Sequence, residues 1–129
     1  MRDVSKTYFI LYVRDQIASR VFYENVLRQQ PTLDVPGMTE FTIQPDTVIG
    51  LMPEQGIARL LGLDVGALSR GSIRGEIYLV ATSPEVYHQR ALAAGAKELS
   101  APAPRDWGDR VAYSLDPDGY VLAFASHNS

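Results

Sequence analysis

The chain has 129 residues, of which 46% are hydrophobic and 21% are charged, and 12 Lys and Arg against 15 Asp and Glu give a formal net charge of −3. This size and composition predict one compact globular domain, and the mild acidity argues against a nucleic-acid partner. Because there is no cysteine, disulfides, a thiolate zinc site and a cysteine nucleophile are excluded, and only His88 and His127 could supply imidazole chemistry.

Hydropathy and the N-terminal residues indicate where the chain acts. No apolar stretch approaches the roughly 18–20 residues of a membrane span. The residues after Met1 lack the pattern of a signal-peptide cleavage site. We therefore expect a cytoplasmic protein with no membrane partner.

The first half of the chain predicts a strand, a helix and two further strands. Asp15 or Ser19 can cap the helix at its start, and Pro31 stops it. Pro45 and Asp46 form a turn between the last two strands. The predicted elements cover residues 8–13, 15–27, 41–44 and 47–52.

The second half repeats this order after a connector at residues 53–74 that has room for one short helix. Ser83 is the expected cap of the second helix, and Gly95 its expected end. The Asp116–Gly119 turn joins the last two strands. The predicted elements cover residues 76–81, 83–94, 107–115 and 120–125.

The repeated order of elements favours an internal duplication. It predicts an α+β fold of two βαββ modules, with a mixed half-barrel sheet and the helices outside. Module one is expected at about residues 5–53, the connector at about 54–74 and module two at about 75–127, within a single domain spanning 1–129.

Strand alternation assigns side chains to two faces. The residues expected to pack under the helices are all apolar: Phe9, Leu11, Val13, Ile77, Leu79, Leu122 and Phe124. The residues expected on the concave face mix aromatic, small and acidic side chains: Tyr8, Ile10, Tyr12, Glu76, Tyr78, Val121, Ala123 and Ala125. Such a mixture is typical of a ligand-binding cleft.

Several segments carry a resemblance to a known family. They are Val13-Arg14-Asp15, the stretch 19–27, Trp107–Arg110 and Asp116–Tyr120. In their order and spacing across the two halves, they resemble the vicinal oxygen chelate superfamily of glyoxalase I, bleomycin-resistance proteins and extradiol dioxygenases. One fold hosts many activities in this superfamily, so the resemblance alone does not fix the reaction.

The resemblance implies four positions at which metal-dependent members place ligands to a divalent ion. They fall on Tyr8, at or near Gly50, on Glu76 and on Ala123. Only Glu76 is a normal ligand for such an ion. We therefore expect neither a metal nor any other cofactor, and the small residues Gly50 and Ala123 would leave room where the metal would otherwise sit.

The expected ligand-binding set is Tyr8, Tyr12, Met52, Glu76, Tyr78, Trp107 and Tyr113, with Glu76 as the one expected catalytic residue. Other interpretations stay open. The tyrosines could be half-buried residues of the sheet, and Trp107, at the expected start of a strand, could cap the fold rather than stack on a ligand. The neighbouring Asp109 and Arg110 are assigned to a surface ion pair or hairpin rim.

Three functions follow as hypotheses. The first is a metal-free protein that binds a small aromatic or cationic molecule as a homodimer, with the apolar residues 57–68 as the candidate contact. The second is an enzyme of the superfamily, either a metal-dependent lyase or dioxygenase with a rearranged site or a metal-free isomerase that uses Glu76 as its base. The third is a scaffold whose cleft is filled by its own side chains.

Overall fold

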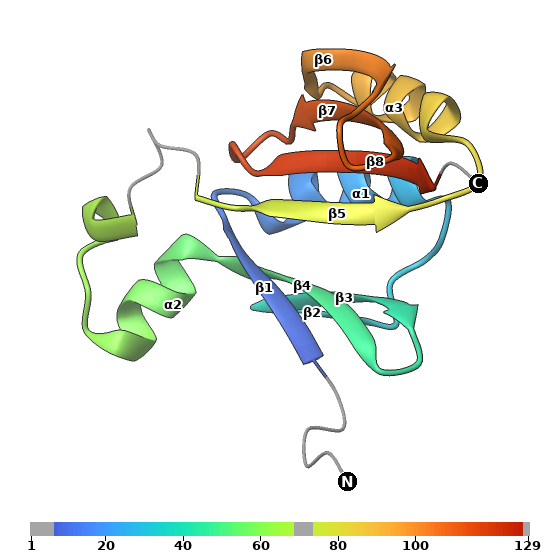
Figure 1. The fold of residues 1–129 in the computed structure, drawn as a ribbon. Coiled ribbons are helices and arrows are strands. Elements are labelled where there is room, and N and C mark those ends of the chain that lie inside the picture. Colours follow the sequence, from blue (N-terminus) through green and yellow to red (C-terminus); the bar gives the residue numbers. More distant parts are fainter. Residues whose placement is uncertain (1–6, 69–73, 128–129) are drawn as a thin grey trace, which may run out of the picture. The chain divides into compact units, whose positions relative to one another are not determined.

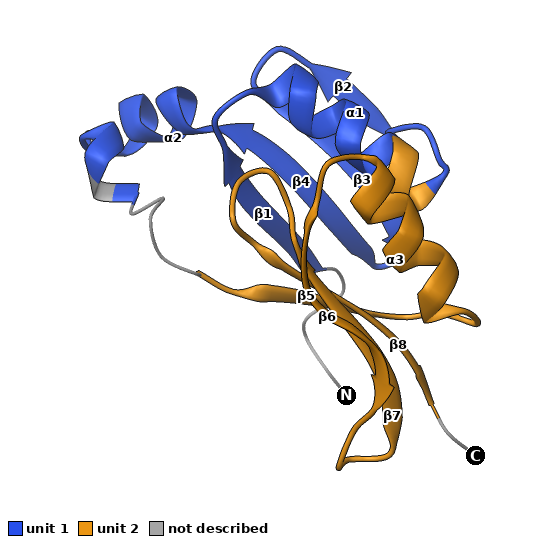
Figure 2. Cartoon of the chain, turned by 90° about the horizontal axis from the view of Figure 1, so that it is seen from above, with its two compact units in different colours: residues 1–24, 28–69 blue, residues 25–27, 70–129 orange. Residues whose placement is uncertain are grey.

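The computed structural model describes residues 7–68 and 74–127, and the contacts within it divide the chain into two compact units (Figure 2). Residues 1–24 and 28–69 form the first unit, and residues 25–27 and 70–129 form the second. The elements, in chain order (Figure 1), are β1 (Thr7–Val13), α1 (Gln16–Leu27), β2 (Leu33–Val35), β3 (Met38–Gln44), β4 (Thr47–Pro53), α2 (Glu54–Leu61), the 3₁₀ helix η1 (Val65–Leu68), β5 (Glu76–Val80), α3 (Pro84–Ala93), β6 (Lys97–Pro104), β7 (Asp109–Leu115) and β8 (Val121–His127).

The two units repeat one sheet topology. The first sheet has the strand order β1-β4-β3-β2 and the second has the order β5-β8-β7-β6. The parallel pairs are β1 with β4 in the first sheet and β5 with β8 in the second, and the other pairs are antiparallel. The duplicated α+β architecture predicted from the sequence is therefore confirmed, as two mixed sheets that do not close.

Each half holds one strand more than was predicted. Strand β2 has three residues lying between Pro31 and Pro36, and β6 contains Pro102 and Pro104. Both are edge strands, where proline is tolerated because one row of backbone groups needs no partner in the sheet. Strand β2 has too few residues for alternation to be recognised, and the two prolines of β6 are typical of a loop, and for these reasons the pattern missed them.

The first unit buries its core between sheet and helix. Asp15 caps α1 by accepting a hydrogen bond from the backbone nitrogen of Ala18 at 3.0 Å, which is one of the two caps predicted. Tyr23 packs on Phe22 and on Phe41 of β3, with ring centroids 4.9 and 6.5 Å apart. Other buried residues of this core are Leu11, Val13, Ile49 and Leu51.

Helix α3 covers one face of the second sheet, where it contacts β6, β7 and β8. Ser83 caps its start by accepting from the backbone nitrogen of Val86 at 3.4 Å, and Gly95 follows its end at φ +110°, as predicted. On this face the ring of Tyr87 lies 5.8 Å from that of buried Phe124. The opposite face of the second sheet, which we call the open face, carries the site described next.

Candidate functional site

The open face is defined by the register of β5, β8 and β7. Tyr78 pairs with Ala123, which pairs in turn with Tyr113, so two tyrosines flank an alanine. Two residues further along β8, and on the same face, Ala125 pairs with Val111. These residues are fully buried and Tyr113 packs against them, so this part of the open face is apolar.

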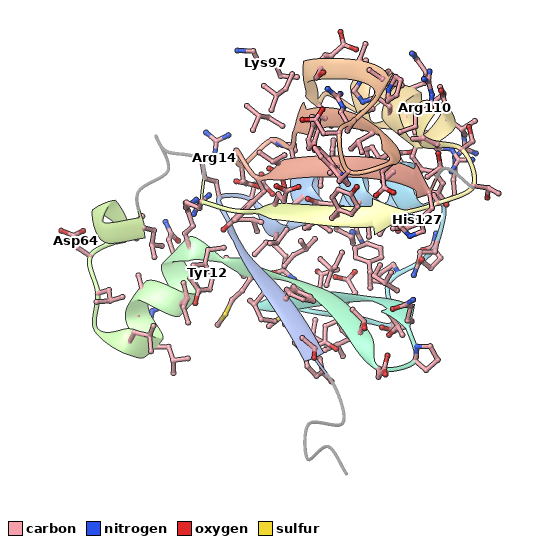
Figure 3. All side chains as sticks on the ribbon, in the orientation of Figure 1. Tyr12, Arg14, Asp64, Lys97, Arg110 and His127 are labelled. Atoms are coloured by element: carbon pink, nitrogen blue, oxygen red, sulfur yellow. The ribbon has the colours of Figure 1, made fainter. Side chains whose placement is uncertain are left out.

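A hydrogen-bonded network crosses this face. Tyr78 donates its hydroxyl proton to Oδ2 of Asp109 at 2.5 Å, and Nε1 of Trp107 donates to the Tyr78 hydroxyl oxygen at 3.0 Å. Oδ1 of Asp109 lies 2.7 Å from Nδ1 of His127, which is at the end of β8 (Figure 3). Both carboxylate oxygens of the buried Asp109 are therefore engaged.

The network shifts two pKa values in opposite directions. The pKa of Tyr78 is raised, first by burial of its hydroxyl and then by its hydrogen bond to Asp109, while the bond from Trp107 acts the other way. The pKa of Asp109 is lowered, first by the hydrogen bond with His127 and then by that from Tyr78. Asp109 is thus held as a carboxylate and Tyr78 as a neutral phenol.

The rings of this network remain accessible. Trp107 is 58% exposed and Tyr78 is 38% exposed. Trp107 lies in the turn between β6 and β7, where Gly108 adopts φ +99° and its nitrogen donates to the carbonyl of Arg105 at 3.1 Å. Because the hydroxyl proton of Tyr78 and the indole N–H of Trp107 are both already donated within the protein, these two side chains offer a ligand mainly ring surface.

The predicted residues fall into both units. Tyr78, Trp107 and Tyr113 come together on the open face of the second. Glu76 pairs with Val121 at the start of β5, on the same face of the sheet, and it is exposed. In the first unit the predicted residues Tyr8, Tyr12 and Met52 share one face of the sheet, where Tyr12 pairs with Met52 and Tyr8 pairs with Val48.

The space expected at Gly50 is already occupied. Its partner on β1 is Ile10, and a Cβ on Gly50 would lie 2.6 Å from Ile10 Cδ1 and 3.2 Å from Met38 Sδ. The expectation that this glycine leaves room is therefore wrong, because side chains of β1 and β3 fill the place. Ala123, the other small residue, is buried in the apolar cluster against which Tyr113 packs.

The residues present do not fit a divalent metal of the kind that the resemblance implies. Across residues 7–68 and 74–127, no three His, Asp or Glu side chains are grouped so that they could hold an ion. His127 is bonded to Asp109, and His88 is buried on α3, where its Nε2 lies 2.9 Å from Oε2 of Glu98. The four family positions contribute one carboxylate, Glu76.

Two members of the network, Asp109 and His127, were not among the predicted site residues, and Trp107 was assigned to the start of a strand. Asp109 and Arg110 do not form a pair with each other, because Arg110 binds Glu85 of α3 at 2.5 Å, on the other side of the sheet (Figure 3). Strand β7 begins at Asp109, so Trp107 lies in the preceding turn and not at a strand start. Alternation along β7 places Asp109 on the same face as Tyr113, and this signal could have identified it.

An open pocket of about 570 Å³ lies in the first unit, beside the start of α1, and none of the predicted site residues lines it. Three of its charged groups have structural roles, since Asp15 caps α1 and Arg20 binds Asp34 at 2.8 Å. Its lining residues are Arg14, Asp15, Gln16, Ile17, Arg20, Asp34, Val35 and Pro36.

Helices long and apolar enough to cross a membrane are absent from the described part of the chain. No protein-family model and no curated protein sequence matches the chain.

Solved structures do match it. A glyoxalase/bleomycin resistance protein/dioxygenase family enzyme from Burkholderia phytofirmans is 23% identical, with a TM-score of 0.79 over 98% of this chain and 99% of its own. A glyoxalase-related enzyme from Fulvimarina pelagi is 20% identical, with a TM-score of 0.79 over 94% and 86%. A glyoxalase/bleomycin resistance protein/dioxygenase from Nocardioides is 21% identical, with a TM-score of 0.75 over 100% and 85%. The chain therefore has the fold of the glyoxalase/bleomycin resistance/dioxygenase proteins, which confirms the resemblance to the vicinal oxygen chelate superfamily at the level of the fold.

Proposed function

We propose that this protein binds a small planar organic molecule, aromatic or cationic, on the open face of the second unit and without a resident metal ion. The observation that carries the proposal is the hydrogen-bonded pair of Trp107 and Tyr78, whose rings are exposed while their polar atoms are fixed. Ordering two large rings before a ligand arrives lowers the entropic cost of binding. The fold is compatible with this class of function, since structural neighbours are described as glyoxalase/bleomycin resistance proteins.

The metal-free part of the proposal depends on donor chemistry. Glycine and alanine have no side-chain donor, and a neutral tyrosine is a poor ligand for a hard cation. Among the four positions that the superfamily uses, Glu76 is therefore the one usual donor, beside Tyr8, Gly50 and Ala123. A single carboxylate does not hold a catalytic ion against water.

Trp107 is the only tryptophan, so its fluorescence reports directly on the proposed site. We expect a saturable change in Trp107 emission when the protein is titrated with planar aromatic compounds of different charge. Tyr78→Phe removes the hydroxyl that orients Trp107 and is expected to weaken binding by about threefold to tenfold.

Tyr87→Phe is the matched control, because Tyr87 lies on α3 and packs against Phe124 on the other side of the second sheet. It should leave the affinity unchanged. An equal loss in both variants, or saturable binding that survives Trp107→Ala in calorimetry, would place the ligand elsewhere.

Metal content separates this proposal from the alternative of a metal-dependent enzyme. Protein purified without chelator and dialysed is expected to contain well below one equivalent of Mn, Fe, Ni or Zn by mass spectrometry. A stoichiometric metal that is lost in Glu76→Ala would overturn the metal-free proposal. Metal-free protein that turns over a substrate in a Glu76-dependent way would instead favour the isomerase, with Glu76 as base.

We further propose that the protein is a homodimer that buries the end of α2. Ile57 and Ala58 already pack inside the first unit, whereas Leu60 and Leu61 are 70% and 56% exposed. Burial of each leucine in an interface is worth about 1.5–3 kcal/mol. Two leucines are removed from each of the two protomers, so analytical ultracentrifugation is expected to show a dimer whose dissociation constant rises by about three to five orders of magnitude in the Leu60→Ser/Leu61→Ser double variant. The matched control Ile17→Ser, at an exposed position of α1, should leave the dimer intact, and a wild-type monomer at high concentration would contradict the proposal.

A further inference from the structure

Arg105, in the turn that carries Trp107, is fixed in place entirely by neutral groups. Its Nη2 atom donates to Ser100 Oγ and to the carbonyl oxygen of Val111, both at 2.8 Å, and to the carbonyl oxygen of Ala101 at 3.2 Å. Its guanidinium also lies over the ring of Tyr113, 5.2 Å from the centroid. Tyr113 belongs to the open face, so the cation is held beside the proposed site.

This cation has no acidic partner within the described residues. The nearest acid of the network, Asp109, already uses one oxygen on Tyr78 and the other on His127. By contrast, Arg110 has a carboxylate partner in Glu85. Arg105 therefore brings a full positive charge to the open face, and its Nη1 amino group makes no hydrogen bond to the described part of the chain.

The position of this charge limits the class of ligand. Arg105 and Trp107 are two residues apart in one turn, and the turn is closed by hydrogen bonds from Arg105 to Asp109 and from Gly108 to Arg105. The guanidinium lies over Tyr113, which follows Tyr78 and Ala123 across the register of the sheet. A flat molecule that extends across the open face from Tyr78 toward Tyr113 would therefore have the guanidinium near its edge. Guanidinium N–H groups pair with carboxylates through charge-assisted hydrogen bonds that are stronger than those between neutral groups.

Resting on the proposed small-molecule function, we infer that the ligand is an aromatic carboxylate: its ring packs on Trp107 and Tyr78, and its carboxylate binds Arg105. The inference keeps the aromatic class of the proposed function, adds a negative charge to the ligand, and excludes the cationic class. Asp109 offers a cationic ligand no carboxylate oxygen without a partner, because Oδ2 accepts from Tyr78 and Oδ1 is hydrogen-bonded to His127. Arg105 is assigned as the residue that determines the charge of the ligand.

The test uses three probes of one shape and different charge: benzoate, benzamide and benzylamine. Ligand-observed NMR or calorimetry on the full chain is expected to show that benzoate binds about tenfold more tightly than benzamide, and that benzylamine binds most weakly. Arg105→Met should remove the preference for benzoate, and Arg105→Lys should keep part of it. Arg90→Met is the matched control, since Arg90 also lies over a tyrosine ring, that of Tyr87 at 4.9 Å, but on α3.

The outcomes separate this inference from the proposed function. If benzamide binds as tightly as benzoate and Trp107→Phe weakens both, the aromatic site stands and the assignment of Arg105 is overturned. If benzoate binds but Trp107→Phe has no effect on any probe, the proposed function itself fails. Should Arg105→Met not fold, the wild-type protein still decides, because benzoate affinity must fall with added NaCl while benzamide affinity does not.

Discussion

Replacing Phe41 or Phe124 with alanine is expected to lower the free energy of unfolding by about 3–5 kcal/mol, the usual cost of emptying a buried phenylalanine site. Both side chains are fully buried, each in the core of its own unit. Phe41 packs against Tyr23 in the first unit, and Phe124 packs against Tyr87 in the second. Urea denaturation followed by far-ultraviolet circular dichroism measures both effects.

The pair of variants also tests whether residues 1–129 fold as one domain, as we propose. Units of about 60 residues bury only about 60% of their unfolded surface and are marginal alone, so we expect one cooperative transition. Trp107 lies in the second unit, and Phe41→Ala should therefore shift the Trp107 fluorescence midpoint as far as it shifts the dichroism midpoint. Independent units would leave the Trp107 transition of Phe41→Ala unchanged. Phe9→Ala, at a 53% exposed position, is the control for loss of a phenylalanine without a cavity.

Most of the fold follows from local sequence signals. The caps at Asp15 and Ser83 and the glycine after α3 fix the helix bounds through hydrogen bonds that involve neighbouring residues. The Asp116 turn is equally local, since its Oδ1 accepts from the backbone nitrogens of Asp118 at 2.9 Å and Tyr120 at 2.8 Å. Strands β2 and β6 were missed because their pairing depends on a neighbouring strand rather than on their own apolar pattern.

The site was predicted less completely, for a physical reason. Tyr78, Trp107 and Tyr113 could be proposed as ring surfaces because large aromatic residues are recognisable singly. The role of Asp109 depends on partners 31 and 18 residues away, and no local pattern specifies them. At Gly50 the sequence shows a missing side chain but not the Ile10 and Met38 side chains that take its place.

Asp109→Asn is expected to disorganise the open face and to weaken ligand binding by about tenfold, because Tyr78, whose hydroxyl accepts from Trp107, loses the charged acceptor that orients it. The variant should also lower the pKa of Tyr78, since the hydrogen bond to Asp109 and the charge of that carboxylate both help to raise it. Absorbance at the tyrosinate band measures this change. The chain has seven tyrosines, so Tyr78 is isolated by difference. The titration of Tyr78→Phe is subtracted from that of wild type, and the titration of the Asp109→Asn/Tyr78→Phe double variant from that of Asp109→Asn.

The stability difference between wild type and Asp109→Asn should depend on pH in a defined way. The lowered pKa of Asp109 contributes stability that is present above the ordinary aspartate value near 3.8 and is lost as pH falls through the lower folded value. The raised pKa of Tyr78 contributes stability that is present below the ordinary tyrosine value of 10.0 and is lost as pH rises through the higher folded value. The difference is therefore expected to be largest between about pH 5 and 9 and to shrink at both extremes. A difference that does not shrink below about pH 4 or above about pH 10 would mean that Asp109 acts through packing alone, and the proposed orientation of Trp107 by a charged network would then be wrong.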